Sequence, residues 1–169
     1  EKANKEFGQI DVLVNNAGMH SRGDLASVDA TDVGAMVDIN LRAPFILSCA
    51  AIPYLKKSVS GAIVMVGSLA GMAPLQGAAT YSGTKSGLRA FTYAISDELR
   101  DTGIHVGLVS PGPIDTGFIM TEIDKVEDIV FSQPMSNATE VADAIVRIAK
   151  GCAVEITMPA SSGKLVTLS

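Results

Sequence analysis

The stretch Ile10-Asp11-Val12-Leu13-Val14-Asn15-Asn16-Ala17-Gly18 joins a short apolar run to a polar turn that ends in glycine. A run that is apolar at almost every position is typical of a strand buried on both faces, as in a parallel sheet covered by helices. The turn follows this run directly. The stretch therefore predicts a buried strand that carries a polar turn at its carboxyl end.

Two further apolar runs, residues 62–66 and 104–109, are separated by long helical patterns. This alternation of strand and helix predicts a doubly wound α/β fold. Gly67-Ser68 follows the first of these runs and Ser110-Pro111-Gly112 follows the second. Ligands bind beyond the carboxyl ends of the strands of an open parallel sheet, so we expect one shared crevice. That these residues only mark turns explains each case singly, but not their common edge.

The helical pattern over residues 30–57 contains Asn40 and Pro44. Proline has no N–H, so the carbonyl of Asn40 should lose its helical partner. A simple kink is the alternative interpretation. Further along, Asn137 and Glu140 predict a capped helix that reaches Lys150. Residues 154–158 and 164–168 look like a final strand or strand pair.

Residues 80–100 form an amphipathic helical pattern that opens with Tyr81-Ser82-Gly83-Thr84-Lys85. Tyr81 and Lys85 are four residues apart, so their side chains should lie on the same face of the helix. A cation nearby favours the phenolate and should lower the pKa of the tyrosine. The pair would then work as a general acid and base. The alternative interpretation is an exposed pair of side chains that has the same spacing but no function.

Taken together, the turn at residues 15–18, Ser68, the Tyr81 to Lys85 segment and Ser110 to Thr116 resemble the short-chain dehydrogenase/reductase family. The resemblance covers almost the whole chain. It implies the C-terminal part of a doubly wound, Rossmann-like parallel sheet with helices on both faces. It also implies hydride transfer between NAD or NADP and a small carbonyl or alcohol substrate, in a homo-oligomer, a dimer or tetramer. The two cysteines, too few for a disulfide framework, fit a cytoplasmic protein.

The same resemblance assigns roles to individual residues. Tyr81 would be the general acid/base, Ser68 would polarise the substrate oxygen, and Lys85 would hold down the tyrosine pKa and bind the nicotinamide ribose. Asn40 would hold a water that links Lys85 to solvent. The positions that match the family's cofactor side are Asn16, Ala17, Gly18, Tyr81, Lys85, Pro111, Gly112, Ile114 and Thr116.

One departure from the family is large. The glycine-rich turn Thr-Gly-x-x-x-Gly-x-Gly does not occur in this sequence, and neither does the following residue that would choose NAD or NADP. We therefore expect residues 1–169 to be a single partial Rossmann-like domain without its first strands, from a longer enzyme or a relic. The competing hypothesis is a catalytically inactive fragment that serves as an oligomerisation or interaction module.

Composition limits the other functions. The chain has 169 residues, is 47% hydrophobic and has a net charge of −5, which predicts one domain and argues against nucleic-acid binding. Cys49 and Cys152 form no disulfide framework, and His20 and His105 have no metal-ligand spacing, so no metal is expected and both histidines should have surface or loop roles. The apolar run at 44–55 is shorter than the ~20 residues of a membrane span. Apolar residues within 116–131 indicate either an apolar substrate or the anchors of a lid.

Overall fold

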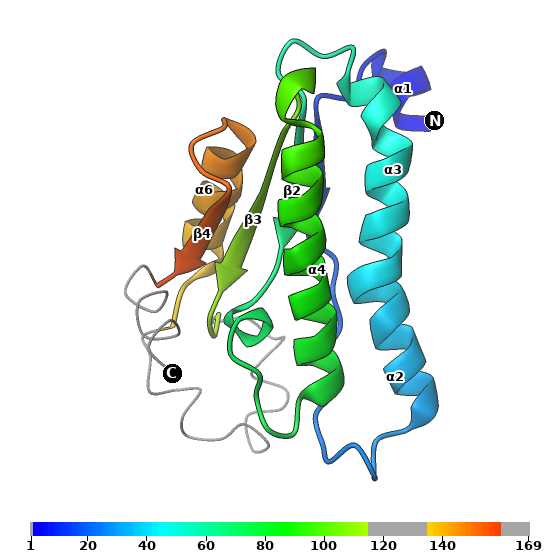
Figure 1. Cartoon of the computed structure of the whole chain (residues 1–169), viewed down its shortest axis with the longest axis vertical. Helices are drawn as coiled ribbons and strands as arrows, with labels where there is room; N and C mark the ends of the chain where they lie inside the picture. The colour runs from blue at the N-terminus through cyan, green and yellow to red at the C-terminus, as the bar shows by residue number, and fades with distance from the viewer. Residues whose placement is uncertain (1, 115–134, 160–169) are drawn as a thin grey trace.

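Four parallel strands form the sheet of the computed structural model, which describes residues 2–114 and 135–159 (Figure 1). Helices connect the strands, so the predicted alternation and the doubly wound α/β class are confirmed. The expected strand at residues 164–168 lies outside the described residues. In spatial order, which is also chain order, the strands are β1 (Val12–Asn15), β2 (Ala62–Val66), β3 (His105–Pro111) and β4 (Glu155–Met158).

Helices cover both faces of this sheet, as expected (Figure 1). On one face, α3 (Ala43–Leu55) packs on β1 and β2 and α4 (Ala79–Glu98) packs on β3, and the rings of Phe45 and Phe91 stack between the two helices with centroids 3.9 Å apart. On the other face lies α6 (Ala138–Ala149), which starts with a complete capping box of Asn137 and Glu140. The short α1 (Lys2–Phe7) precedes the sheet. The innermost side chains are Leu55, Ile63, Val64, Met65, Leu88, Leu108, Val109 and Ile148.

Strand β1 departs from the expectation of burial on both faces. Val12 and Val14 are 42% and 40% exposed, whereas Leu13, which points the other way, packs against the core under α3. Helix α6 lies against β2, β3 and β4, so it leaves this face of β1 open. Within the described residues, only one of the two apolar faces of β1 is therefore covered by other side chains.

The predicted long helix is continuous over residues 30–55 but changes its winding in the middle. Between α2 (Ala30–Val37) and α3, residues Asp38–Arg42 form a π-helical turn. The N–H of Ala43 bonds the carbonyl of Asp38, five residues back. This wider turn, just before Pro44, is found in place of a simple kink, and π-turns are frequent at functional sites.

The same helix corrects one expectation from the sequence. Its 26 residues, with a hydropathy of 1.4 in the most apolar window, are long and apolar enough to cross a membrane by length and composition alone. In the molecule its buried residues Met36, Asn40, Ser48, Ala51 and Leu55 face the rest of the fold. The helix therefore forms part of the layer over the sheet.

Candidate active site

The carboxyl ends of the strands meet beside the start of α4, as the sequence predicted. The ammonium Nζ of Lys85 donates to the carbonyl of Val66, the last residue of β2, at 2.9 Å. The N–H of Gly67 donates to the carbonyl of Val109 in β3 at 2.7 Å. A Cβ atom on Gly18, after β1, would lie 3.6 Å from the same Nζ. One buried ammonium thus stands where the segments after β1 and β2 converge.

Tyr81 lies at the first turn of α4, above this point. The Lys85 Nζ is 5.7 Å from the centre of the Tyr81 ring, so the two side chains share a helix face as expected. The side chain of Ser68 lies next to the phenol, where its hydroxyl affects the pKa of Tyr81. Ser68 Oγ also accepts from the N–H of Ala70 at 3.1 Å and thereby caps a short 3₁₀ turn, Leu69–Gly71. The structure therefore brings Ser68, Tyr81 and Lys85 together at one place.

The electrostatics of this pair differ from the sequence expectation. Burial raises the pKa of Tyr81, and the hydrogen bond from Ser68 and the charge of Arg22 oppose that rise without cancelling it. Burial also lowers the pKa of Lys85 to about 8. Both shifts have the same cause, because burial disfavours the charged form of either group. Without cofactor and substrate, the buried lysine does not bring the phenol pKa below its usual value.

Asn40 is almost completely buried and connects three segments. Its side-chain amide donates to the Met19 carbonyl and accepts from the Met19 N–H, both at 2.8 Å. It also lies 3.3 Å from Thr84 Oγ1, on α4 between Tyr81 and Lys85. The π-helical turn points this amide at the loop after β1. In the structure, Asn40 holds the loop after β1 in place through its hydrogen bonds with Met19. That Asn40 also holds a water linking Lys85 to solvent remains an expectation.

The residues on the expected cofactor side lie along the same edge. Asn16, Ala17 and Gly18 are exposed. Gly112 donates its N–H to the Met158 carbonyl at 2.8 Å, and a Cβ there would lie 3.2 Å from Leu69. Pro111 is buried, Ile114 forms an isolated bridge with Ser136, and Thr116 lies outside the described residues.

Sequence reasoning assigned His20 to a surface or loop role and missed its contact with Tyr81. The two rings meet edge to face, with centroids 4.5 Å apart and an interplanar angle of 77°. His20 comes two residues after Gly18, so its place at a strand end already put it near the crevice. Metal binding is a different matter: within residues 2–114 and 135–159, no three His, Cys, Asp or Glu side chains are grouped so that they could hold a metal ion.

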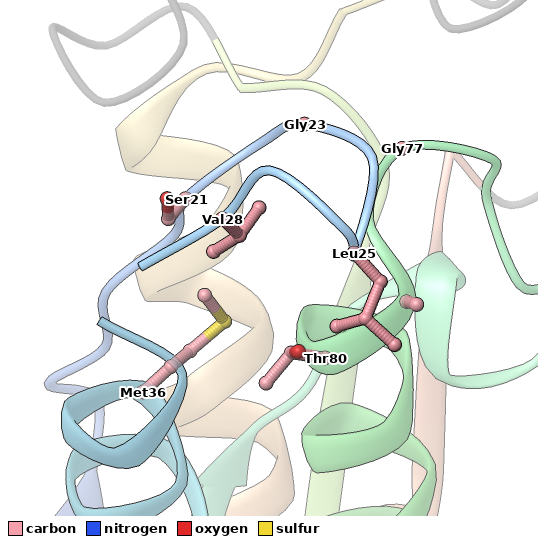
Figure 2. A pocket seen from close by; sticks show the side chains of 8 residues that line it. Ser21, Gly23, Leu25, Val28, Met36, Gly77 and Thr80 are labelled. Carbon is pink, nitrogen blue, oxygen red and sulfur yellow. The ribbon is translucent and has the colours of Figure 1, made fainter. Parts of the chain in front are cut away.

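A small, partly open hollow lies next to this loop (Figure 2). Thr80, the neighbour of Tyr81, and Ser21, the neighbour of His20, lie in its wall, so the hollow adjoins the site. Figure 2 shows Met36 and Thr80 pointing into it from their helices, with Leu25 and Val28 on the loop above. The remaining lining residues are Gly23, Gly77 and Ala79.

Comparison with known proteins agrees with this geometry. Residues 1–127 match the family model described as short chain dehydrogenase. The chain is 34% identical over 110 residues to an uncharacterized oxidoreductase of Staphylococcus epidermidis, covering 65% of this chain and 48% of that protein. It is 32% identical over 161 residues to the 3-oxoacyl-(acyl-carrier-protein) reductase FabG of Escherichia coli, covering 93% and 66%. A Synechocystis 3-oxoacyl-(acyl-carrier-protein) reductase is 37% identical over 131 residues, covering 78% and 52%.

A parallel sheet with its polar site at the carboxyl edge defines a Rossmann-like α/β protein. The chain belongs to the short-chain dehydrogenase/reductase family. It spans about half the length of the first curated relatives that it matches.

Proposed function

We propose that this chain carries the proton-transfer half of a nicotinamide-dependent oxidoreductase that interconverts a carbonyl and an alcohol. The observation that supports this proposal best is the buried Lys85 ammonium between Tyr81 and Val66, beside Gly18. A lysine that is only 5% exposed loses much of its hydration. Such a residue is more readily explained by a task in the site than by stability.

The residues present fit the nicotinamide side of a dinucleotide. The ammonium of Lys85 has three N–H donors, and among the described residues it donates to the carbonyl of Val66. The other donors could bind ribose hydroxyls. A Cβ at Gly18 would lie 3.3 Å from Asn40 Oδ1 and 3.6 Å from Lys85 Nζ, so glycine lets the loop pass close to these two site residues. The pyrophosphate has no such partners here, because the glycine-rich turn does not occur in this sequence.

When bound, the nicotinamide would donate or accept the hydride. In the reducing direction the Tyr81 hydroxyl would give its proton to the substrate oxygen, and in the oxidising direction the phenolate would take that proton back. Ser68, whose side chain lies next to the phenol, would donate to the same substrate oxygen. The positive charge of Lys85 would favour the phenolate during proton transfer, against the effect of burial, and Asn40 would keep the proton path to solvent open.

Two observations bear on the class of substrate. The side chains of Leu25, Val28 and Met36 next to Thr80 give this side of the site an apolar surface. Two relatives are named as 3-oxoacyl-(acyl-carrier-protein) reductases, which act on a 3-oxoacyl group. We propose a carbonyl substrate that carries an apolar group next to the reacting carbon, with NAD or NADP as the cofactor.

Replacing Tyr81 by phenylalanine tests the proposal. In the whole protein, Tyr81→Phe should lower kcat by 10²–10⁴-fold, because it removes the transferable proton and little else. Cofactor affinity should hardly change. Tyr54→Phe is the matched control, since Tyr54 lies on α3 away from the strand ends. The assay follows NADH and NADPH absorbance with a panel of ketones and 3-oxoacyl thioesters; a Tyr81→Phe protein that keeps more than about a tenth of kcat would exclude Tyr81 as the proton donor.

We also propose that the protein is a homo-oligomer. Helix α3 turns apolar side chains outward, and Ile46 and Leu47 are 55% and 49% exposed. A second copy that covers this face would bury them. Ile46→Lys should therefore lower the mass measured by sedimentation, whereas Val59→Lys, at a fully exposed turn, should not. An unchanged mass in Ile46→Lys would show that α3 is not the contact.

A further inference from the structure

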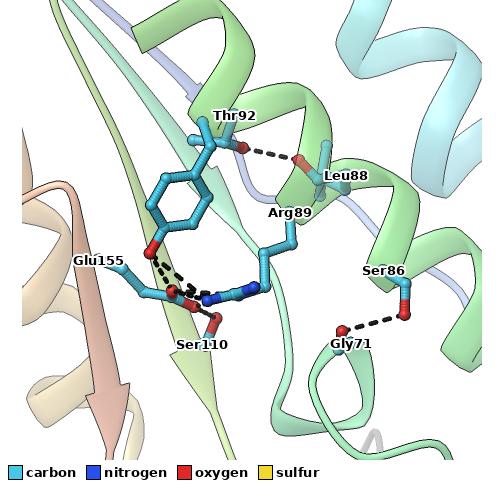
Figure 3. A network of polar contacts seen from close by, with 8 residues as sticks. Gly71, Ser86, Leu88, Arg89, Thr92, Ser110 and Glu155 are labelled. Atoms are coloured by element: carbon cyan, nitrogen blue, oxygen red, sulfur yellow. Dashed lines mark hydrogen bonds and ion pairs between the residues drawn. The ribbon is translucent and has the colours of Figure 1, made fainter. Parts of the chain in front are cut away.

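A second polar cluster lies further along α4, about two turns beyond Tyr81, and its centre is Glu155 (Figure 3). Glu155 is the first residue of β4, and its side chain is only 9% exposed. Arg89 of α4 donates to it from Nη2 at 2.9 Å and from Nε at 3.1 and 3.2 Å. Tyr93 Oη donates at 2.6 Å, and Ser110 Oγ of β3 donates at 2.7 Å. One carboxylate thus joins α4, β3 and β4.

This carboxylate is held in its charged form. Burial raises the pKa of Glu155, but the hydrogen bonds from Arg89, Tyr93 and Ser110 outweigh burial and leave the pKa below its usual value. Glu155 in turn raises the pKa of Arg89. A shielded ion pair of this kind stabilises a fold little more than apolar side chains of the same volume would. Its clear effect is geometric, because a bidentate guanidinium fixes both distance and orientation.

The two anchored residues belong to the two segments that build the proposed site. Arg89 is one helical turn after Lys85 and two turns after Tyr81, on the same side of α4. Ser110 directly precedes Pro111 and Gly112, on the expected cofactor side. The Glu155 carboxylate therefore sets how the helix that carries the acid/base lies relative to the strand that leads into Gly112.

We propose that Glu155 is a positioning residue of this site, acting through Arg89 and Ser110 to hold Tyr81 and Lys85 in register with the Pro111–Gly112 segment. This inference rests on the proposed function. A misplacement of about 1 Å in a catalytic constellation can lower a rate by ~10²-fold. The ion pair should matter to turnover and to cofactor KM well beyond its effect on stability.

The double variant Arg89→Met/Glu155→Met separates the two effects. It removes the whole ion pair and leaves no buried charge without a partner, so the melting temperature should fall only by the cost of the lost acceptor for Ser110 and Tyr93. In the whole protein we expect kcat to fall at least tenfold and cofactor KM to rise. Asp97→Asn is the matched control, because Asp97 near the end of α4 forms an exposed pair with Arg100 just after the helix and should change neither parameter.

Ser110→Ala is the second variant, in case the double variant does not fold. It deletes only the link from Glu155 to β3 and leaves the ion pair with Arg89, so cofactor KM should rise while kcat changes less. Normal kcat and KM in a stable double variant or, if that variant does not fold, in Ser110→Ala would overturn the inference. Such a result would leave the proposed function standing if the wild type is active.

Amide hydrogen exchange tests the same inference without any activity. The Gly112 N–H, which bonds the Met158 carbonyl, should exchange faster in either variant, whereas amides of β2 should keep their protection. If the wild-type protein shows no dehydrogenase activity, the proposed function fails and exchange alone decides the role of Glu155. Unchanged exchange at Gly112 would then overturn it.

Discussion

The fold buries the Lys85 ammonium and thereby destabilises its charged form. Its pKa is about 8, against 10.5 for a free side chain, and burial is the cause. At neutral pH the charged form is therefore disfavoured in the folded chain by about 3 kcal/mol. A fold that retains such a group gives up stability for it, which is common where a side chain serves a site.

The first prediction concerns the pH dependence of this cost. Between pH 8 and 10.5 the unfolded chain binds the Lys85 proton more tightly than the folded chain, so the contribution of Lys85 to stability rises with pH across this window. Lys85→Met should thus be more stable than the wild type at pH 7, by up to about 3 kcal/mol less the lost bond to Val66. The advantage should shrink toward pH 10.5.

Urea unfolding of both proteins at pH 7 and at pH 10 measures this difference. A gap between the two proteins that does not change with pH would show that Lys85 titrates normally in the folded chain. Lys85→Met should also lower both kcat and cofactor affinity of the whole protein, since Lys85 has two proposed tasks. A change in only one of these parameters would contradict the double role.

The elements of the fold depend on close backbone contacts at a few glycines. Gly107 lies in the middle of β3, where an added Cβ would come within 2.7 Å of Ile148 Cγ2 and 2.9 Å of the Val154 carbonyl. The carbonyl belongs to the backbone beside β4 and has little freedom to move. Gly34, inside α2, has nothing within 4 Å of the same position.

These two glycines should respond to alanine in opposite ways. Gly107→Ala should lower the free energy of unfolding by ~1–3 kcal/mol through overpacking between α6 and β3. Gly34→Ala should raise it by ~0.5–1 kcal/mol, because alanine favours a helix interior. Thermal or urea midpoints decide the matter, and a Gly107→Ala protein as stable as the wild type would mean that α6 can shift away from the sheet.

The local sequence pattern was enough to predict the strands and the common sheet edge at which the polar residues lie. The run at residues 62–66 is β2 without change, and Asn137 with Glu140 forms the cap that its spacing predicts. Pattern was not enough where distant residues decide. The exposure of Val14, the contact of His20 with Tyr81 and the burial of Glu155 all depend on which element lies opposite, and a linear sequence does not state that. The direction of the Tyr81 pKa shift was missed for the same reason, since it depends on burial.

At the scale of the whole molecule, β1 is the least covered part of the sheet. It pairs with β2 on one side, and Val12 and Val14 are exposed on one face. An apolar strand in this position favours pairing or packing with further chain. We therefore propose that residues 1–169 are a partial domain and that further strands cover β1 in the whole protein.

The last prediction tests cofactor binding by these 169 residues alone. The proposed site holds the nicotinamide side, but the backbone and helix N-terminus that bind a pyrophosphate are not provided by this sequence. Titration of the isolated chain with NADH or NADPH, followed by nicotinamide fluorescence, should give no saturation at micromolar concentration. Saturable binding there would show that the phosphate turn is dispensable, and the whole protein is the positive control.

The π-helical turn at Asp38–Arg42 has a consequence for length changes in evolution. One residue fewer would convert it to an ordinary α-helical turn, and the two halves of the long helix would keep nearly the same orientation, because the wider turn is what accommodates the extra residue. Each half would still be a good helix, so the loss would hardly appear in a count of secondary structure. Asn40, however, would turn away from Met19 and Thr84, its present partners. Family members that differ by a deletion in this turn should therefore have lost the catalytic arrangement while keeping the fold.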